Sequence, residues 1–230
     1  MKICNFKLAI LMYAISGLGL IYYLVSSFAS LFVPPLLRVV LLVAICLCAY
    51  LGSIKLSKTS KSPQKIMKAT FWGFFVLYIY FLVTLVCFDS YFGRVGIDGL
   101  STWNAQTLSS YLQTHLNLIP FKTITKFVVA PFVDSNITSK QIITNILGNL
   151  VAFSPFAFFL PLLFKRLKKF GNFLLAMIAI VTVVELSQFA LLTGYCEIDD
   201  LILNVGGAAI LFWILRIDKI KRLVERLVGF

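Results

Sequence analysis

Hydrophobic residues along this chain gather into long runs that are separated by shorter polar connections. An α-helix rises about 1.5 Å per residue, so about 20 apolar residues can cross the hydrocarbon core of a bilayer. The runs predict membrane-spanning helices at residues 8–33, 36–54, 71–88, 141–164, 173–193 and 201–215. The first run is too long for a cleavable signal peptide. The first two runs meet at Pro34-Pro35 and predict a tight helical hairpin, whereas the last is short and needs residues from both flanks.

The overall composition also favours a multi-pass membrane protein over a soluble domain. Hydrophobic residues make up 60% of the 230 residues and charged residues only 13%, whereas soluble domains average about 25% charged. Phe accounts for 22 residues, more than a soluble core of this size could bury. We therefore expect an all-α membrane helix bundle of about six transmembrane helices.

The basic residues predict which side of the membrane each connection faces. Most of the 21 Lys and Arg residues lie near the N-terminus, in the connections after the second and fourth spans, and in the C-terminal tail. The positive-inside rule assigns such segments to the cytoplasm, so both termini are predicted to be cytoplasmic. Because these charges orient helices and meet anionic headgroups, the net charge of +12 does not indicate nucleic-acid binding.

This arrangement suggests two parts of the chain. Residues 1–69 are predicted to form an N-terminal two-helix hairpin with its basic cytoplasmic loop. Residues 70–230 are predicted to form a larger membrane domain, which includes a long external loop at residues 89–140.

Each of the last three predicted helices carries one polar stripe near its external end. Spacings of three or four residues place side chains on one face of a helix. The stripes are Gln141, Asn145 and Asn149 in the fourth span, Thr182, Glu185 and Gln188 in the fifth, and Asp200, Asn204 and Ala208 in the sixth. Because the stripes lie at similar depths, we expect them to form one polar cluster.

Glu185 is the most informative member of this cluster because it lies inside a span. An ionised carboxylate facing lipid costs several kcal/mol, so this side chain should face the bundle and be paired or protonated. Glu197, Asp199 and Asp200 stand together just before the sixth span, where an aspartate can cap that helix. The asparagines can be interhelical hydrogen-bonding partners without a ligand. A cation site built from Glu185, the two aspartates and an asparagine oxygen is a further alternative.

Several enzymatic mechanisms lack the residues that they need. The one histidine, His115, lies in the external loop, which disfavours a two-histidine lipid phosphatase and a Ser–His intramembrane protease. The five cysteines show no CxxC or other ligand spacing, so no metal site of the zinc type and no cofactor is expected. Glu185 is the candidate acid or base if the chain is an enzyme.

The external loop contains a segment suited to a membrane surface. Apolar residues including Leu108 and Leu112 recur at helical spacing ahead of "NLIPF", residues 117–121. Such a segment is expected to lie on the membrane surface or to re-enter it. Arg94 is the external cation best placed to meet the acidic residues or a phosphate, and a role as a headgroup anchor is the alternative.

Three blocks of sequence resemble the VanZ-like family of bacterial membrane proteins. They are "NLIPF" at 117–121, "NILGNLVAFSPFAFFLP" at 145–161, and "VELSQ" with "IDDLILNVGGA" between 184 and 208. The blocks cover roughly the C-terminal half of the chain, in the order and spacing of the family. The chain departs from the family's pattern at Pro155-Phe156-Ala157, where members often carry a glycine, and ahead of the acids, where many carry an arginine.

The resemblance implies a multi-pass protein of the bacterial plasma membrane that acts at the cell envelope, since the founding member is linked to resistance to the glycopeptide teicoplanin. Membrane lipids and a lipid-linked wall precursor or lipoglycopeptide are the candidate partners. The motifs mark as candidate site residues Asn117, Pro120, Asn145, Asn149, Glu185, Gln188, Asp199, Asp200 and Asn204. Two other functions stay open: an enzyme that modifies a lipid-linked envelope substrate, and a non-catalytic scaffold or small transporter.

Overall fold

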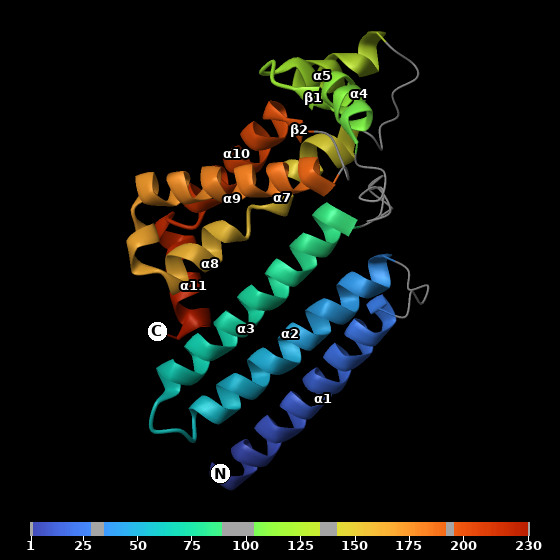
Figure 1. Ribbon diagram of the computed structural model, residues 1–230. Helices are drawn as coiled ribbons and strands as arrows, with labels where there is room; N and C mark the ends of the chain where they lie inside the picture. Colours follow the sequence, from blue (N-terminus) through green and yellow to red (C-terminus); the bar gives the residue numbers. More distant parts are fainter. Residues whose placement is uncertain (1, 29–34, 89–103, 134–141, 192–195, 230) are drawn as a thin grey trace. The chain divides into compact units, whose positions relative to one another are not determined.

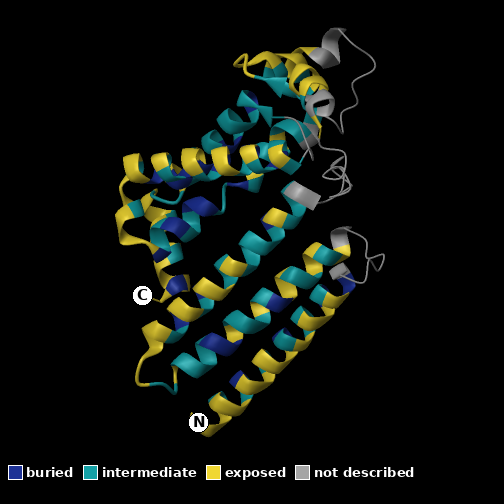
Figure 2. Ribbon diagram, viewed as in Figure 1, coloured by how far each residue is buried: buried dark blue, intermediate teal, exposed yellow. Residues whose placement is uncertain are grey.

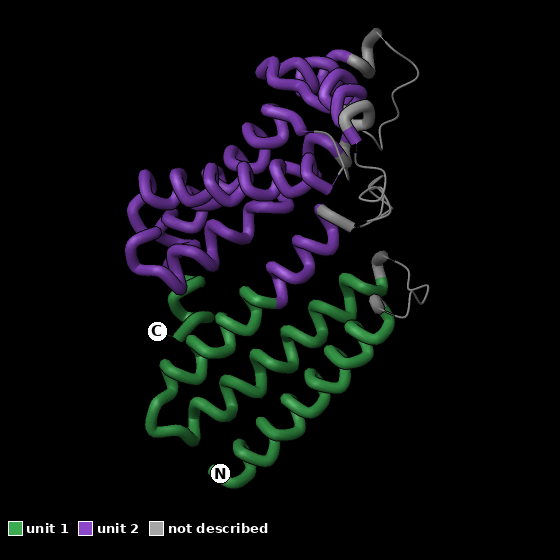
Figure 3. Tube along the Cα trace, viewed as in Figure 1, with its two compact units in different colours: residues 1–76, 222–230 green, residues 77–221 purple. Residues whose placement is uncertain are grey.

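The computed structural model describes residues 2–28, 35–88, 104–133, 142–191 and 196–229, and these are almost entirely helical (Figure 1). They divide into two compact units (Figure 3). The first unit is Met1–Val76 with Arg222–Phe230, and the second is Leu77–Lys221. The predicted all-α class is confirmed.

The first unit is built on two long helices, α1 (Lys2–Phe28) and α2 (Pro35–Ser57). It also holds the start of α3 (Pro63–Val83) and the end of α11 (Asp218–Val228). The expected hairpin is present, because α1 and α2 pack against each other. Ser16 Oγ donates a hydrogen bond to the carbonyl of Ile45 at 3.0 Å, a polar contact of the kind that joins helices inside a membrane.

The second unit contains the rest of the described elements. They are the π-helical turn η1 (Thr84–Phe88), α4 (Ala105–His115), β1 (Leu116–Asn117), α5 (Lys122–Val133), the π-helical turn η4 (Ile143–Leu147), α7 (Gly148–Ala152), α8 (Phe156–Leu163), the short 3₁₀ helix η5 (Lys165–Lys168), α9 (Phe170–Leu191), β2 (Cys196–Glu197) and α10 (Ile198–Ile214). Helices α3 and α11 cross the boundary between the units.

The described residues contain five helices that are long and apolar enough to cross a membrane, and a sixth crossing if α10 and α11 count as one bent span. This agrees with the predicted bundle of about six helices. The sixth span begins earlier than predicted, at Ile198, and takes no residues from its other flank. Instead the chain bends by 89° between α10 and α11.

The fourth span, Asn145–Leu163, is broken rather than continuous. A turn at residues 153–155 separates α7 from α8, because Pro155 has no N–H to continue the helical hydrogen bonds. Tyr78 of α3 donates its hydroxyl hydrogen to the carbonyl of Ala152 at 2.8 Å. Its ring packs edge-on against Phe156, with 5.2 Å between ring centroids. The carbonyl at the break therefore has a partner inside the apolar bundle, as backbone groups in a membrane require.

One stripe of buried residues runs along α9, whose burial Figure 2 colours. The stripe changes from apolar to polar side chains toward the end of the helix. Its members, at helical spacing, are Phe173, Met177, Val181, Glu185 and Gln188. Phe173 stacks on Phe212 of α10 with ring centroids 4.5 Å apart. Thr182 was expected on this stripe but is exposed, so Val181 takes its place beside Glu185.

Candidate functional site

Asp199 is fully buried and binds the start of another helix. Its carboxylate accepts hydrogen bonds from the backbone N–H groups of Phe121 at 2.5 Å, Thr123 at 2.7 Å and Ile124 at 3.0 Å. The first N–H groups of a helix have no partner within the helix and carry a partial positive charge, so a carboxylate there satisfies both. Capping of its own helix was one alternative for Asp199 or Asp200; the Asp199 carboxylate caps α5 instead.

The "NLIPF" block is tied to β2 by further contacts. Strands β1 and β2 pair in parallel, with Leu116 opposite Cys196 and Asn117 opposite Glu197. The Asn117 side chain donates to Thr123 Oγ1 at 3.0 Å and accepts from the N–H of Ile119 at 3.4 Å. The strand pairing and the bonds to Asp199 thus bring the "NLIPF" block to the start of α10, whereas the Asn117 side chain joins β1 to α5.

Asp200 faces a different helix from its neighbour. The Asn149 side chain donates from Nδ2 to Asp200 Oδ1, which links α7 to α10. Gly207 lies two turns further along α10, where an added Cβ would stand 1.8 Å from the carbonyl oxygen of Leu150. Glycine therefore allows α10 and α7 to approach at backbone distance, as small residues do between helices in membranes.

Asn204 lies between Asp200 and Gly207 on the same face of α10. Its side chain is only 2% exposed. Within the described part of the chain, its Oδ1 atom is buried and has no hydrogen-bond partner. A buried acceptor without a partner is unfavourable, so this oxygen is suited to receive a hydrogen bond from a bound group or a water molecule.

The polar end of α9 also meets the start of α10. Gln188 donates from Nε2 to the carbonyl of Val86 in η1 at 2.9 Å, and Glu185 is 7% exposed. Burial raises the pKa of the Cys196 thiol, and the nearby carboxylates of Glu185, Asp200 and Glu197 raise it further. The carboxylates of Glu185, Asp200 and Glu197 therefore all lie near Cys196, just before the start of α10.

We call Asn149, Glu185, Asp200 and Asn204 the polar cluster. The structure joins the stripes of the fourth and sixth spans through Asn149 and Asp200. A single cluster of all three stripes stays a prediction. Asp199 and Asn117 hold α5 instead. Asn145 is half-buried in η4 and Pro120 is exposed ahead of α5. Arg94 and Gln141 lie outside the described residues.

The arrangement of the acidic residues disfavours the alternative of a cation site. Among the described residues, no group of three or more His, Cys, Asp or Glu side chains is arranged to hold a metal ion. Both oxygens of Asp199 already accept backbone hydrogen bonds. Its Oδ1 accepts one of these bonds and its Oδ2 two, so most of its acceptor positions are already used.

The pattern of the sequence does not identify several hydrogen-bonding groups of the second unit. Thr123, Tyr78 and the carbonyl of Val86 were not identified. For the start of α5 a signal exists, since Pro120 precedes Lys122 closely and proline is common where helices begin. For Tyr78 and Val86 the pattern of the sequence offers none.

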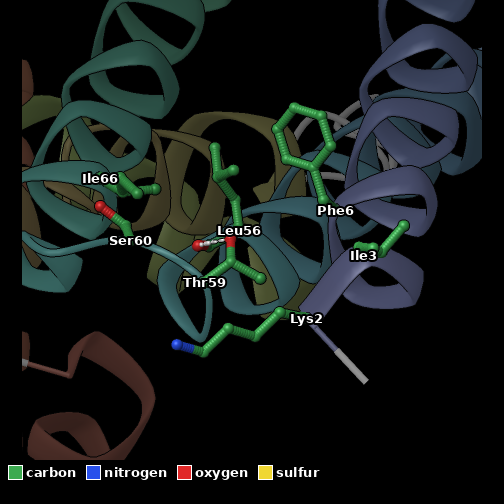
Figure 4. Close-up of a pocket in the computed structure, with 7 residues that line it drawn as sticks. All are labelled: Lys2, Ile3, Phe6, Leu56, Thr59, Ser60 and Ile66. Carbon is green, nitrogen blue, oxygen red and sulfur yellow. Dashed lines mark hydrogen bonds between the residues drawn. The ribbon is translucent and has the colours of Figure 1, made fainter.

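A separate surface hollow belongs to the first unit (Figure 4). It has a volume of about 570 Å³ and is lined by Lys2, Ile3, Phe6, Leu56, Thr59, Ser60 and Ile66. Lys2 is the charged member of this lining. None of the candidate site residues lines the hollow, so it adds nothing to the polar cluster.

Comparison with known protein families identifies the family to which these motifs belong. The model of the VanZ/LLP1 family matches residues 75–220. No curated protein and no solved structure matches the chain. The family match covers more than half of the sequence and includes α5, the polar cluster and every block that resembles the family. The chain belongs to the VanZ/LLP1 family and is a VanZ-like multi-pass membrane protein.

Proposed function

We propose that this protein acts at the outer leaflet of the bacterial plasma membrane and lowers the sensitivity of the cell to lipoglycopeptide antibiotics such as teicoplanin. Membership of the VanZ/LLP1 family supports a role at the cell envelope. The positive-inside rule puts the end of α9 and the start of α10 on the external side. The polar cluster would then open toward the outer leaflet, with lipids and lipid-linked wall precursors as partners.

The observation that carries the proposal is a set of buried hydrogen-bonding groups within an apolar bundle. Asp200 binds Asn149, Glu185 is buried, and Asn204 has a buried oxygen without a partner among the described residues. Polar and ionisable groups at membrane depth are unfavourable unless they face a partner or a ligand. Amide and hydroxyl donors of a glycopeptide or a wall precursor are ligands of suitable chemistry.

The acyl tail explains why teicoplanin should respond more than vancomycin. Each buried CH₂ contributes about 0.8 kcal/mol to membrane anchoring, so a tailed drug concentrates at the outer leaflet. Vancomycin lacks the tail. A protein that changes how the drug or its lipid-linked target is presented at this leaflet should affect the tailed drug more strongly.

Expression of the chain in a susceptible Gram-positive host tests the proposal. The minimum inhibitory concentration of teicoplanin should rise, and that of vancomycin should rise less. Glu185→Gln should remove this difference, because it replaces the buried carboxyl group at nearly constant shape. Thr182→Val is the matched control, since Thr182 lies on the same helix but is exposed, and it should behave like the original chain.

Other outcomes would contradict the proposal. No change for either drug, with the protein present in the membrane, would leave the scaffold or transporter function. Equal changes for both drugs would indicate altered precursor chemistry, as an enzyme would produce. Glu185→Leu helps to separate the enzyme from the scaffold or transporter. If this variant keeps the effect on teicoplanin, Glu185 is neither a catalytic acid nor a required hydrogen-bond partner.

A further inference from the structure

Three large apolar side chains project from the turn between β1 and α5. Leu118 is 63% exposed, Ile119 61% and Phe121 58%. We call residues 118–121 the apolar tip. Side chains of this size are normally withdrawn from water, and a contiguous exposed apolar group marks a surface that contacts a partner or a membrane.

The tip is held in its exposed form by hydrogen bonds. Phe121 has φ of 64°, a left-handed conformation that is rare for a bulky residue other than glycine. Its N–H is bound to the buried carboxylate of Asp199 at 2.5 Å. A left-handed conformation of this kind persists only where neighbouring contacts hold it. The bond to Asp199 therefore fixes the backbone that exposes these apolar side chains.

The position of the tip in the fold points to the edge of a bilayer. Asp199, which binds the tip, is in the first turn of α10. The apolar part of α10 begins directly after Asp200, so the acids stand where a membrane-spanning helix meets the headgroups. The tip is bound at the same level, next to the boundary between headgroups and acyl chains.

The charges beside the tip complement a lipid surface. Lys122 and Lys126 on the first turns of α5 are both exposed, and Val128 on the same helix is 55% exposed. Exposed apolar side chains next to lysines are typical of segments that lie in the interface of a membrane with anionic lipids.

We propose that the apolar tip inserts Leu118, Ile119 and Phe121 into the acyl-chain region of the leaflet, with Lys122 and Lys126 at the lipid phosphates and Asp199 as the positioning residue. The proposal concerns the lipid surface and does not depend on any effect on antibiotics. A second copy of the chain or another protein is the competing occupant of this surface.

Spin-label accessibility in the full chain tests the insertion. The five native cysteines are replaced by alanine, one nitroxide is placed at Ile119→Cys, and the chain is reconstituted in vesicles of phosphatidylethanolamine and phosphatidylglycerol. The label should collide more with oxygen, which partitions into acyl chains, than with a water-soluble nickel chelate. Gln113→Cys on the exposed face of α4 is the matched control and should show the opposite preference.

Two results would overturn insertion into lipid. A label at 119 that matches the label at 113 would put the tip in water. A label at 119 that is immobile and shielded from both reagents would assign the surface to a protein contact.

A second pair of variants tests the role of Asp199. Asp199→Asn should raise the mobility of the label at 119 and its collisions with the nickel chelate, because the amide cannot accept all three N–H bonds. Glu197→Gln, a half-buried neighbour whose side chain makes no cap bond, should leave both quantities unchanged. If Asp199→Asn leaves the accessibility of the label at 119 unchanged, Asp199 has no positioning role. Insertion into lipid is still decided by comparing the label at 119 with the label at 113.

Discussion

Two adjacent aspartates at the start of α10 have different roles. Asp199 is 0% exposed and is satisfied by backbone N–H groups of α5, whereas Asp200 binds the Asn149 side chain. A hydrogen bond to a charged group contributes about 1.5–3 kcal/mol, and the positive end of the α5 dipole adds to it. This explains how a carboxylate is tolerated at a fully buried position. The two neighbouring carboxylates therefore bind different elements, Asp199 the start of α5 and Asp200 the side chain of Asn149 on α7.

Neighbouring glycines in α10 predict opposite effects of the same substitution. Gly207→Ala would put a Cβ 1.8 Å from the carbonyl oxygen of Leu150, whereas Gly206→Ala meets nothing within 4 Å. We expect Gly207→Ala to destabilise the protein by about 1–3 kcal/mol, as overpacking does. Gly206→Ala should be neutral or stabilise by up to about 1 kcal/mol through helix propensity. Thermal unfolding in detergent measures both, and equal midpoints would contradict the close packing of α10 on α7.

At the scale of elements, Arg216 links the end of α10 to a neighbouring connection, just before the chain bends into α11. The Arg216 guanidinium lies 3.2 Å from the centre of the Phe212 ring and donates to the carbonyl of Lys168 at 2.8 Å. A cation over an aromatic ring, combined with a hydrogen bond, suits the planar guanidinium better than a lysine. This contact links α10 to the connection between α8 and α9.

Helix α11 is predicted to lie in the membrane surface and not to continue the sixth span. Six of its 11 residues are charged, which is unfavourable in hydrocarbon. Its apolar residues Ile220, Leu223, Val224 and Leu227 recur at helical spacing, as in interfacial helices. Single spin labels from 218 to 228 should give oxygen accessibility that peaks at these four positions. A flat profile, or continuous oxygen exposure, would exclude the interfacial arrangement.

The helices were predictable from the sequence because they depend on local information. Long apolar runs predicted the spans, and residue spacing placed Glu185 and Gln188 on one face of α9, where both are buried. The break at Pro155 was not predicted, because hydropathy alone is continuous across it. The bend after α10 was missed for a different reason: the amphipathic pattern of α11 was counted only as a basic tail.

The candidate site was predictable only in part, because its key contacts are not local. Residue spacing placed Asp200 and Asn204 on one face of α10. It also selected Asn149, whose side chain binds Asp200 from α7. No periodicity can show that Asp199 binds backbone groups 76 residues away. The error at Thr182 has another cause, since spacings of three and four both fit a helix with 3.6 residues per turn.

At the scale of the whole molecule, the orientation in the membrane is the main prediction still open to experiment. The distribution of Lys and Arg predicts cytoplasmic termini, so Cys4, which is exposed, should react with a membrane-impermeant maleimide only after permeabilisation. Gln113→Cys should react in intact cells, because the loop that contains α4 is predicted to be external. Labelling of Cys4 in intact cells would reverse the orientation and contradict the proposed action at the outer leaflet.

Cys196 is a poor reporter of this orientation, and its pH dependence makes a prediction of its own. Burial and the carboxylates of Glu185, Asp200 and Glu197 raise the pKa of its thiol. Only the thiolate reacts, so below this pKa the rate rises about tenfold per pH unit and stays lower than for a free thiol. Labelling in intact cells should therefore be slower at Cys196 than at Gln113→Cys at neutral pH. The ratio of the two rates should shrink only after the pH passes the pKa of the freer thiol at 113. Asp200→Asn should speed the reaction at Cys196, because it removes one negative charge. The same rate at both positions at neutral pH would contradict the raised pKa of the Cys196 thiol, and no effect of Asp200→Asn would exclude a contribution of that carboxylate.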